Sequence, residues 1–86
     1  MPTISQFFGI SIRMYYDDHA PPHFHAYYGM NAGIIDIETL RLREDTLARR
    51  ARALVLEWAA EYRDELLADW LLVEAHQPLN NIDPLE

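Results

Sequence analysis

The sequence of 86 residues carries 14 acidic and 7 basic side chains, has a formal net charge of −7, and is 50% hydrophobic. This length fits one domain spanning residues 1–86, and the apolar content excludes a chain kept disordered by its own charge. There is no cysteine, so disulfides, thiolate ligands and a cysteine nucleophile are excluded. We expect a cytoplasmic protein with no signal peptide and no membrane insertion.

Alternating apolar residues predict strands in the first half of the chain. From about residue 3 to residue 16 they fall at even positions, which is the period of a strand, and Gly9 would mark a bend or bulge. Turn formers and two prolines fill residues 17–22, and residues 23–28 predict a second strand. A third strand is predicted over about residues 34–42. Such short connections favour a three-stranded antiparallel meander.

An apolar stripe at helical spacing predicts a helix over about residues 46–76, because no glycine or proline interrupts it before Pro78. A straight helix of that length would measure roughly 45 Å and would overhang so small a sheet. We therefore predict one long or kinked helix, bending near residues 62–65, with a helical hairpin as the alternative. The tail over residues 77–86 has apolar anchors and should fold back, which gives an α+β fold.

The charge is uneven along the chain. Residues 1–40 carry −3, residues 41–52 carry +3 with five arginines, and residues 53–86 carry −7. The average excludes a broadly basic nucleic-acid binder, while the arginine segment suits phosphate groups or forms a solvated helix face. A homo-oligomer is expected, because so small a domain buries a modest core and a projecting helix would pack on another copy.

Three of the four histidines and two aspartates lie within residues 17–25. On a strand, His23 and His25 would point to one face with side chains about 7 Å apart. They would serve as general acid and base for cleaving RNA through its own 2′-hydroxyl without a metal. His19 is the third catalytic candidate, and Asp17 and Asp18 would orient the imidazoles.

Four further residues are candidates for substrate binding. Arginine would stabilise developing phosphorane charge, and tyrosine would stack on a base or donate a hydrogen bond. These candidates are Arg13, Arg41, Arg43 and Tyr27.

Two alternatives remain for the same histidines. His19, His23 and His25, or an aspartate from the same loop, would supply three ligands to zinc or another divalent ion and leave one position open. His-x-His spacing is a weak signal, so no cofactor is expected, and a divalent metal ion is the alternative. In the structural alternative, His19 and His23 bond to Asp17 or Asp18 and fix the turn.

Several of these segments resemble a known family, the small bacterial domain-of-unknown-function family 4160. The segments that carry the resemblance are Pro2-Thr3-Ile4, Met14-Tyr15-Tyr16, Pro21-Pro22-His23-Phe24-His25-Ala26, Glu57-Trp58-Ala59 and Ile82-x-Pro84-Leu85. The resemblance implies a small cognate protein encoded nearby, in a layout suggested for toxin–antitoxin pairs, and it brings no established reaction. The expected function is a toxin-like, metal-independent ribonuclease. A non-catalytic protein-interaction module and a histidine-rich metal-binding domain are the alternatives.

Overall fold

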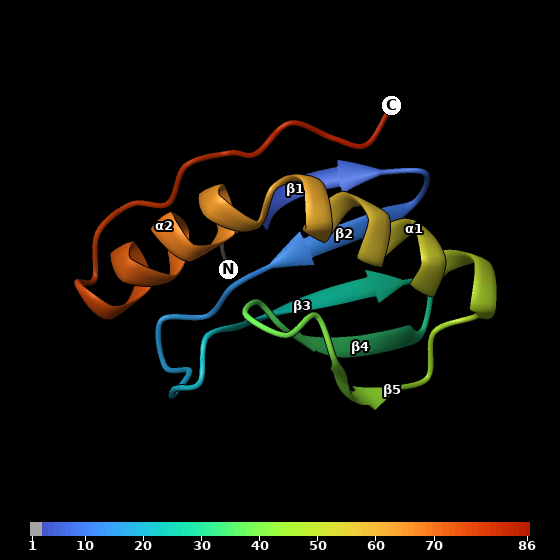
Figure 1. Ribbon diagram of the computed structural model, residues 1–86, viewed down its shortest axis with the longest axis horizontal. Coiled ribbons are helices and arrows are strands. Elements are labelled where there is room, and N and C mark those ends of the chain that lie inside the picture. Colours follow the sequence, from blue (N-terminus) through green and yellow to red (C-terminus); the bar gives the residue numbers. More distant parts are fainter. Residues whose placement is uncertain (1–2) are drawn as a thin grey trace.

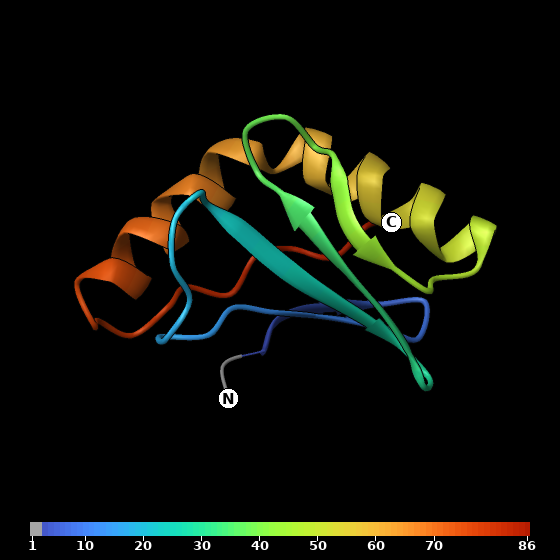
Figure 2. The same cartoon turned by 90° about the horizontal axis from the view of Figure 1, so that it is seen from below.

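The computed structural model of the protein describes residues 3–86, so Met1 and Pro2 lie outside the described residues. Its elements are β1 (Thr3–Phe7), β2 (Ile10–Arg13), β3 (His23–Tyr28), β4 (Asn31–Asp36), β5 (Leu42–Asp45), α1 (Arg49–Glu61) and α2 (Arg63–Glu74). The strands form one antiparallel sheet in chain order. Both helices lie on the same side of this sheet (Figures 1 and 2), so the predicted α+β class and antiparallel order are confirmed.

The described sheet has five strands, where the alternation predicted three. The strand predicted over residues 3–16 is a hairpin of β1 and β2, because Phe8 and Gly9 form a two-residue turn with φ angles of 49° and 81°. Such a turn, with positive φ at both positions, matches the twist of the strands that it joins. The apolar Phe8 extends the alternation across this turn, which hides the turn in the sequence.

The third predicted strand is also divided in two. β4 starts at Asn31, directly after a two-residue turn at Gly29 and Met30, and ends before the loop over residues 37–41. β5 follows this loop as a separate edge strand. The loop was not predicted because its apolar residues, Ile37 and Leu40, continue the strand pattern although the backbone turns there.

Two helices replace the single helix predicted over residues 46–76. They are separated at Tyr62, whose φ of −109° and ψ of 24° interrupt the helix within the stretch where a bend was predicted. α2 continues onward from α1 at an angle and does not turn back as a hairpin (Figure 2). The longest dimension of the molecule is 33 Å, so the predicted overhang does not arise. Neither described helix is long and apolar enough to cross a membrane.

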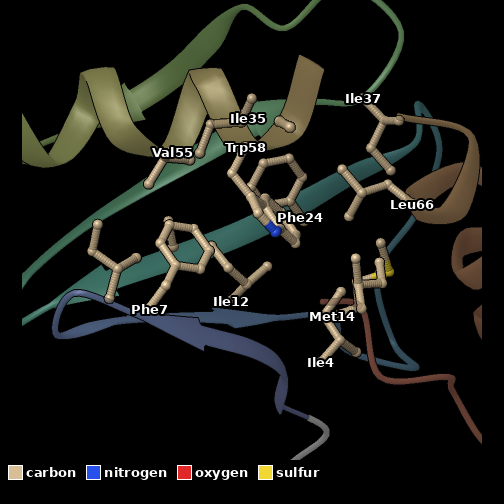
Figure 3. Packing of buried hydrophobic residues seen from close by; sticks show 14 of the residues in the cluster. Ile4, Phe7, Ile12, Met14, Phe24, Ile35, Ile37, Val55, Trp58 and Leu66 are labelled. Carbon is tan, nitrogen blue, oxygen red and sulfur yellow. The ribbon is translucent and has the colours of Figure 1, made fainter. Parts of the chain in front are cut away.

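The hydrophobic core fills the space between the helices and the sheet (Figure 3). Its largest member, Trp58 of α1, is fully buried, with ring centroids 5.3 Å from Phe7 and 5.8 Å from Phe24. Successive residues of a strand point to opposite faces. Because Phe24 points into this core, its neighbours His23 and His25 point away from it; His25 lies on the open face, and His23, at the end of β3, is buried against α2.

The tail after α2 folds back as predicted. The amide of Ile82 donates a hydrogen bond to the carbonyl oxygen of Ile4 (2.8 Å), and the indole Nε1 of Trp58 donates one to the carbonyl oxygen of Asp83 (2.8 Å). Ile82 and Leu85 are buried. The tail therefore covers the outer edge of β1 and completes the core from that side.

One acidic side chain lies on the core side of α2. Asp69 is 1% exposed, and its Oδ1 accepts a hydrogen bond from the amide of Asn80 in the tail (3.0 Å). Its Oδ2 has no hydrogen-bond partner among residues 3–86. Burial raises the pKa of Asp69, and the nearby Glu65 raises it further, although the bond from Asn80 acts in the opposite direction. This carboxyl group is therefore an exception within an apolar layer.

Candidate functional site

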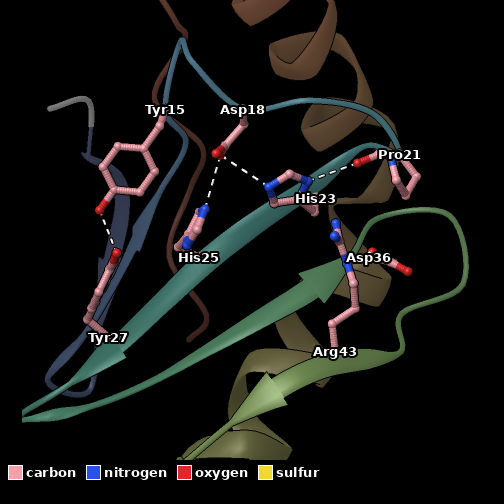
Figure 4. Close-up of polar contacts among 8 residues, drawn as sticks. All are labelled: Tyr15, Asp18, Pro21, His23, His25, Tyr27, Asp36 and Arg43. Atoms are coloured by element: carbon pink, nitrogen blue, oxygen red, sulfur yellow. Dashed lines mark hydrogen bonds and ion pairs between the residues drawn. The ribbon is translucent and has the colours of Figure 1, made fainter.

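Three polar side chains meet where β3 begins. Asp18 comes from the loop between β2 and β3, and His23 and His25 are the first and third residues of β3. The Oδ2 atom of Asp18 lies 3.2 Å from Nε2 of His23 and 3.0 Å from Nε2 of His25 (Figure 4). One ligand-type atom from each residue lies within 4.8 Å of the other two. We refer to these residues as the Asp18–His23–His25 cluster.

The imidazole of His23 is held in one orientation by the loop. Its Nδ1 lies 2.8 Å from the carbonyl oxygen of Pro21, and because a carbonyl can only accept, Nδ1 must carry a proton. In a neutral imidazole the other nitrogen, Nε2, then has a lone pair, and this lone pair faces the carboxylate of Asp18. Two acceptor groups at 3.2 Å are reconciled by a proton or a cation between them, which is a proton on His23, a proton on Asp18 or a metal ion.

Residues of α2 and of the neighbouring strands surround His23. Its ring centroid is 5.2 Å from that of Trp70, and the side chain of His23 is only 7% exposed. On the other side, Asp36 is the cross-strand partner of His23 and forms an ion pair with Arg43 (2.6 Å; Figure 4). The imidazole of His23 is therefore fixed by packing as well as by its hydrogen bond to Pro21.

Two tyrosines flank His25. The ring of Tyr15 meets His25 edge-on at 4.7 Å, and the ring of Tyr27 lies nearly parallel to it at 6.3 Å. The two tyrosine hydroxyls are hydrogen-bonded to each other at 2.5 Å (Figure 4). Burial, together with this hydrogen bond, raises the pKa of Tyr27 to about 12. The phenol of Tyr27 is therefore a neutral group at physiological pH.

The predicted arginines occupy different places. Arg13 of β2 is the cross-strand partner of His25, and its guanidinium carbon lies 4.9 Å from the ring centroid of Tyr27. Arg43 is neutralised by Asp36, and Arg41 is exposed in the loop before β5. Of the residues predicted to bind substrate, the structure brings Arg13 and Tyr27 to the side of the cluster.

The loop residues next to Asp18 point elsewhere. His19 and Asp17 are exposed, and Asp18, rather than His19, forms the group with His23 and His25. The carbonyl of Pro21 and the ring of Trp70 were not anticipated as supporting groups. Every residue has a backbone carbonyl, so the sequence does not indicate which one will accept a hydrogen bond. Trp70 reaches the cluster only because α2 extends past the end of β3.

Acidic residues line two grooves beside the cluster. One groove passes from His25 across β4 to β5 and is lined in part by Glu44 and Asp45. The other lies beside Asp18, where Glu74 contributes to its wall. Arg13 stands on a third side, in β2. Because Arg52 pairs with Asp45, the negative charge on two sides of the cluster comes from Glu44 and Glu74, and the side towards β2 is positive.

Comparison with known proteins gives one match. The model of a protein family described as "Domain of unknown function (DUF4160)" matches residues 9–71, which is nearly three quarters of the chain and includes the whole cluster. No curated protein and no solved structure matches the chain.

Proposed function

The chain belongs to the family of domains of unknown function DUF4160, and from this premise we propose that it binds a divalent transition-metal ion through Asp18, His23 and His25. The observation that carries the proposal is the convergence of two imidazole Nε2 atoms on one carboxylate oxygen, at 3.0 and 3.2 Å. Imidazole and carboxylate together are ligands preferred by zinc and related ions.

The distances suit an ion with little rearrangement. Ligand atoms about 2.1 Å from a tetrahedral ion lie about 3.4 Å from one another. The Asp18 oxygen is already close to this separation from both nitrogens. An ion at the centre of the cluster would also be one way to reconcile the lone pair of His23 with the carboxylate of Asp18.

The cluster also has outer groups of the kind that support metal ligands. The second nitrogen of a ligating histidine usually donates to a carbonyl or carboxylate, which fixes the ring and its tautomer. The Pro21 carbonyl accepts such a bond from His23. Three protein ligands leave a fourth position open to water or substrate, as in catalytic rather than purely structural sites. A bound ion would activate that water or polarise a substrate oxygen.

A metal-independent ribonuclease fits this geometry less well. A general acid and a general base must act on opposite sides of the scissile phosphate, so their nitrogens need to flank a group of several atoms. Here both Nε2 atoms and the Asp18 oxygen lie within 4.8 Å of one another. They converge on a space that suits a single ion better than a phosphodiester.

The proposal is tested by titrating chelator-treated protein with Co²⁺ and with Zn²⁺. We expect one ion per chain, and visible Co²⁺ absorption typical of nitrogen and oxygen ligands. Asp18→Asn and His25→Ala should each weaken binding by at least tenfold. His76→Ala is the matched control, since His76 is exposed beyond α2 and should bind metal as the wild type does.

Two results would overturn the proposal. One is wild-type protein that binds neither ion at micromolar concentration. The other is loss of binding in His19→Ala but not in His25→Ala, which would place the ion in the loop. RNA cleavage that persists in excess chelator and is lost in His25→Ala would instead support the metal-independent histidine pair.

A further inference from the structure

One arginine on the open face of the sheet has no acidic partner. Arg43 and Arg52 pair with aspartates at 2.6 and 2.9 Å, whereas Arg13 makes no ion pair within residues 3–86. The Nε atom of Arg13 is shielded from water and has no hydrogen-bond partner there. The guanidinium rests on the ring of Tyr27 instead. The other arginines without an ion pair in residues 3–86 are all exposed, whereas Arg13 is half-buried beside the cluster; those four are Arg41, Arg49, Arg50 and Arg63.

This guanidinium lies beside the proposed metal centre. Arg13 and His25 face each other across β2 and β3, and residues paired in this way have Cβ atoms about 5 Å apart on one face. The ring of Tyr27, on which the guanidinium of Arg13 lies, is nearly parallel to the ring of His25. The cation and the metal ligands therefore share one face and belong to adjacent strands.

We propose that the metal centre binds a phosphate-bearing ligand, with one phosphate oxygen at the open coordination position and another hydrogen-bonded to Arg13. This inference rests on the proposed function. A divalent ion held by one carboxylate and two neutral imidazoles retains one positive charge, and Arg13 adds another, so the pair attracts an anion. The planar fork of arginine matches phosphate oxygens through its two terminal NH2 groups.

The shape of the ligand follows from the two binding groups. They are separate and approach from neighbouring strands, so the ligand must present oxygens in more than one direction. A tetrahedral phosphate does this, whereas a carboxylate presents two oxygens in one plane. The tyrosine rings beside Arg13 give flat surfaces on which a nucleobase stacks, so a phosphodiester of single-stranded RNA is a source of the group as well as free phosphate.

The charges around the cluster fix the side of approach. Glu44 and Asp45 line the groove towards β5, and Glu74 lies in the groove beside Asp18. Arg52 neutralises Asp45, so Glu44 and Glu74 are the groups that disfavour an anion in these grooves, whereas Arg13, without an ion pair in residues 3–86, stands on the side towards β2. The phosphate would therefore bind between the metal ion and Arg13, over the rings of Tyr15 and Tyr27.

The test uses full-length protein loaded with Co²⁺ and titrated with inorganic phosphate, with acetate, and with a short single-stranded RNA. The Co²⁺ absorption spectrum reports coordination, and calorimetry reports affinity. Phosphate should perturb the spectrum, and Arg13→Gln should weaken phosphate at least tenfold while Co²⁺ affinity stays within about threefold of wild type. Arg13→Lys should lie in between, and Arg63→Gln, an exposed arginine in α2, should behave as the wild type.

The possible results separate the two proposals. If Co²⁺ does not bind, the proposed function fails, and the ligand assignment fails with it. If Co²⁺ binds but phosphate affinity is the same in Arg13→Gln as in wild type, only the role of Arg13 is wrong. Acetate binding as tight as phosphate would overturn the phosphate assignment. RNA that binds more tightly than phosphate, and loses this advantage in Arg13→Gln, would identify RNA as the source of the phosphate group.

Discussion

Neighbouring residues of β3 serve opposite faces of the sheet, and the two faces differ in where their partners come from. Phe24 and Ala26 are completely buried on the face covered by the helices, where α1 supplies Trp58 as a neighbour. On the open face, His25 is surrounded by groups from the preceding loop and from β2. The core contacts and the polar cluster are therefore separated along a single strand, one residue apart.

The sharpest test of this separation compares two substitutions in adjacent positions. Phe24→Ala should lower the free energy of unfolding by about 3–5 kcal/mol, because it leaves a cavity against Trp58. His25→Ala, on the open face, should cost less than about 1 kcal/mol in metal-free protein. Urea unfolding followed by tryptophan fluorescence measures both. Equal losses for the two variants would show that the faces are not independent.

Asp69 is a buried acidic residue on the otherwise apolar covered face, and the pH dependence of stability tests how much its burial costs. Its pKa is raised by burial in the folded protein, so between the unfolded and folded pKa values the folded state binds more protons. Stability therefore falls as pH rises through this interval, from about pH 4 upward. Asp69→Asn should remove this slope and raise stability at pH 7 by about 1 kcal/mol.

The measurement is urea unfolding of wild type and Asp69→Asn at several pH values from 4 to 7. Asp64→Asn is the matched control, because Asp64 is exposed in the same helix and should keep the wild-type slope. A variant with unchanged pH dependence would mean that Asp69 is solvated through an opening of the tail.

Phe8 is the opposite exception, an apolar residue left outside the core. It is 59% exposed and holds a positive φ of 49° in the turn between β1 and β2. Asparagine followed by glycine is the favoured pair for this turn type. Phe8→Asn should therefore raise the thermal unfolding midpoint and increase the free energy of unfolding by about 0.5 kcal/mol. Thermal unfolding measures the change. A destabilised variant would show that the exposed ring contributes packing that its exposure conceals.

Much of the open face was predictable, because a period of two places His23 and His25 on one side whatever the rest of the fold. The third member was not, since a loop has no period, and neighbours such as Asp18 and His19 have equal claims until the loop is folded. Arg13 reaches His25 only through the register of β2 against β3. That register depends on turns and packing distant from either residue.

The number of elements was harder to predict than their type. Gly9 marked a bend, but the exposed Phe8 beside it continued the apolar pattern and masked a complete turn. At Tyr62, by contrast, no glycine or proline marks the break between the helices, and the apolar stripe continues through it. Only the size of the sheet argued for a bend there. In both places the backbone changes direction at a residue whose side chain suits either structure.

The tail has a consequence for how the protein is made. Ile82 bonds to Ile4, and the carbonyl of Asp83 is the acceptor for Trp58, so residues near opposite ends of the chain share one core. A ribosome synthesises β1 well before the tail. Until residue 85 has emerged, the outer edge of β1 is bare and Leu85 is missing from the core. The domain therefore closes only once this tail has emerged, although the residues of the Asp18–His23–His25 cluster are synthesised much earlier.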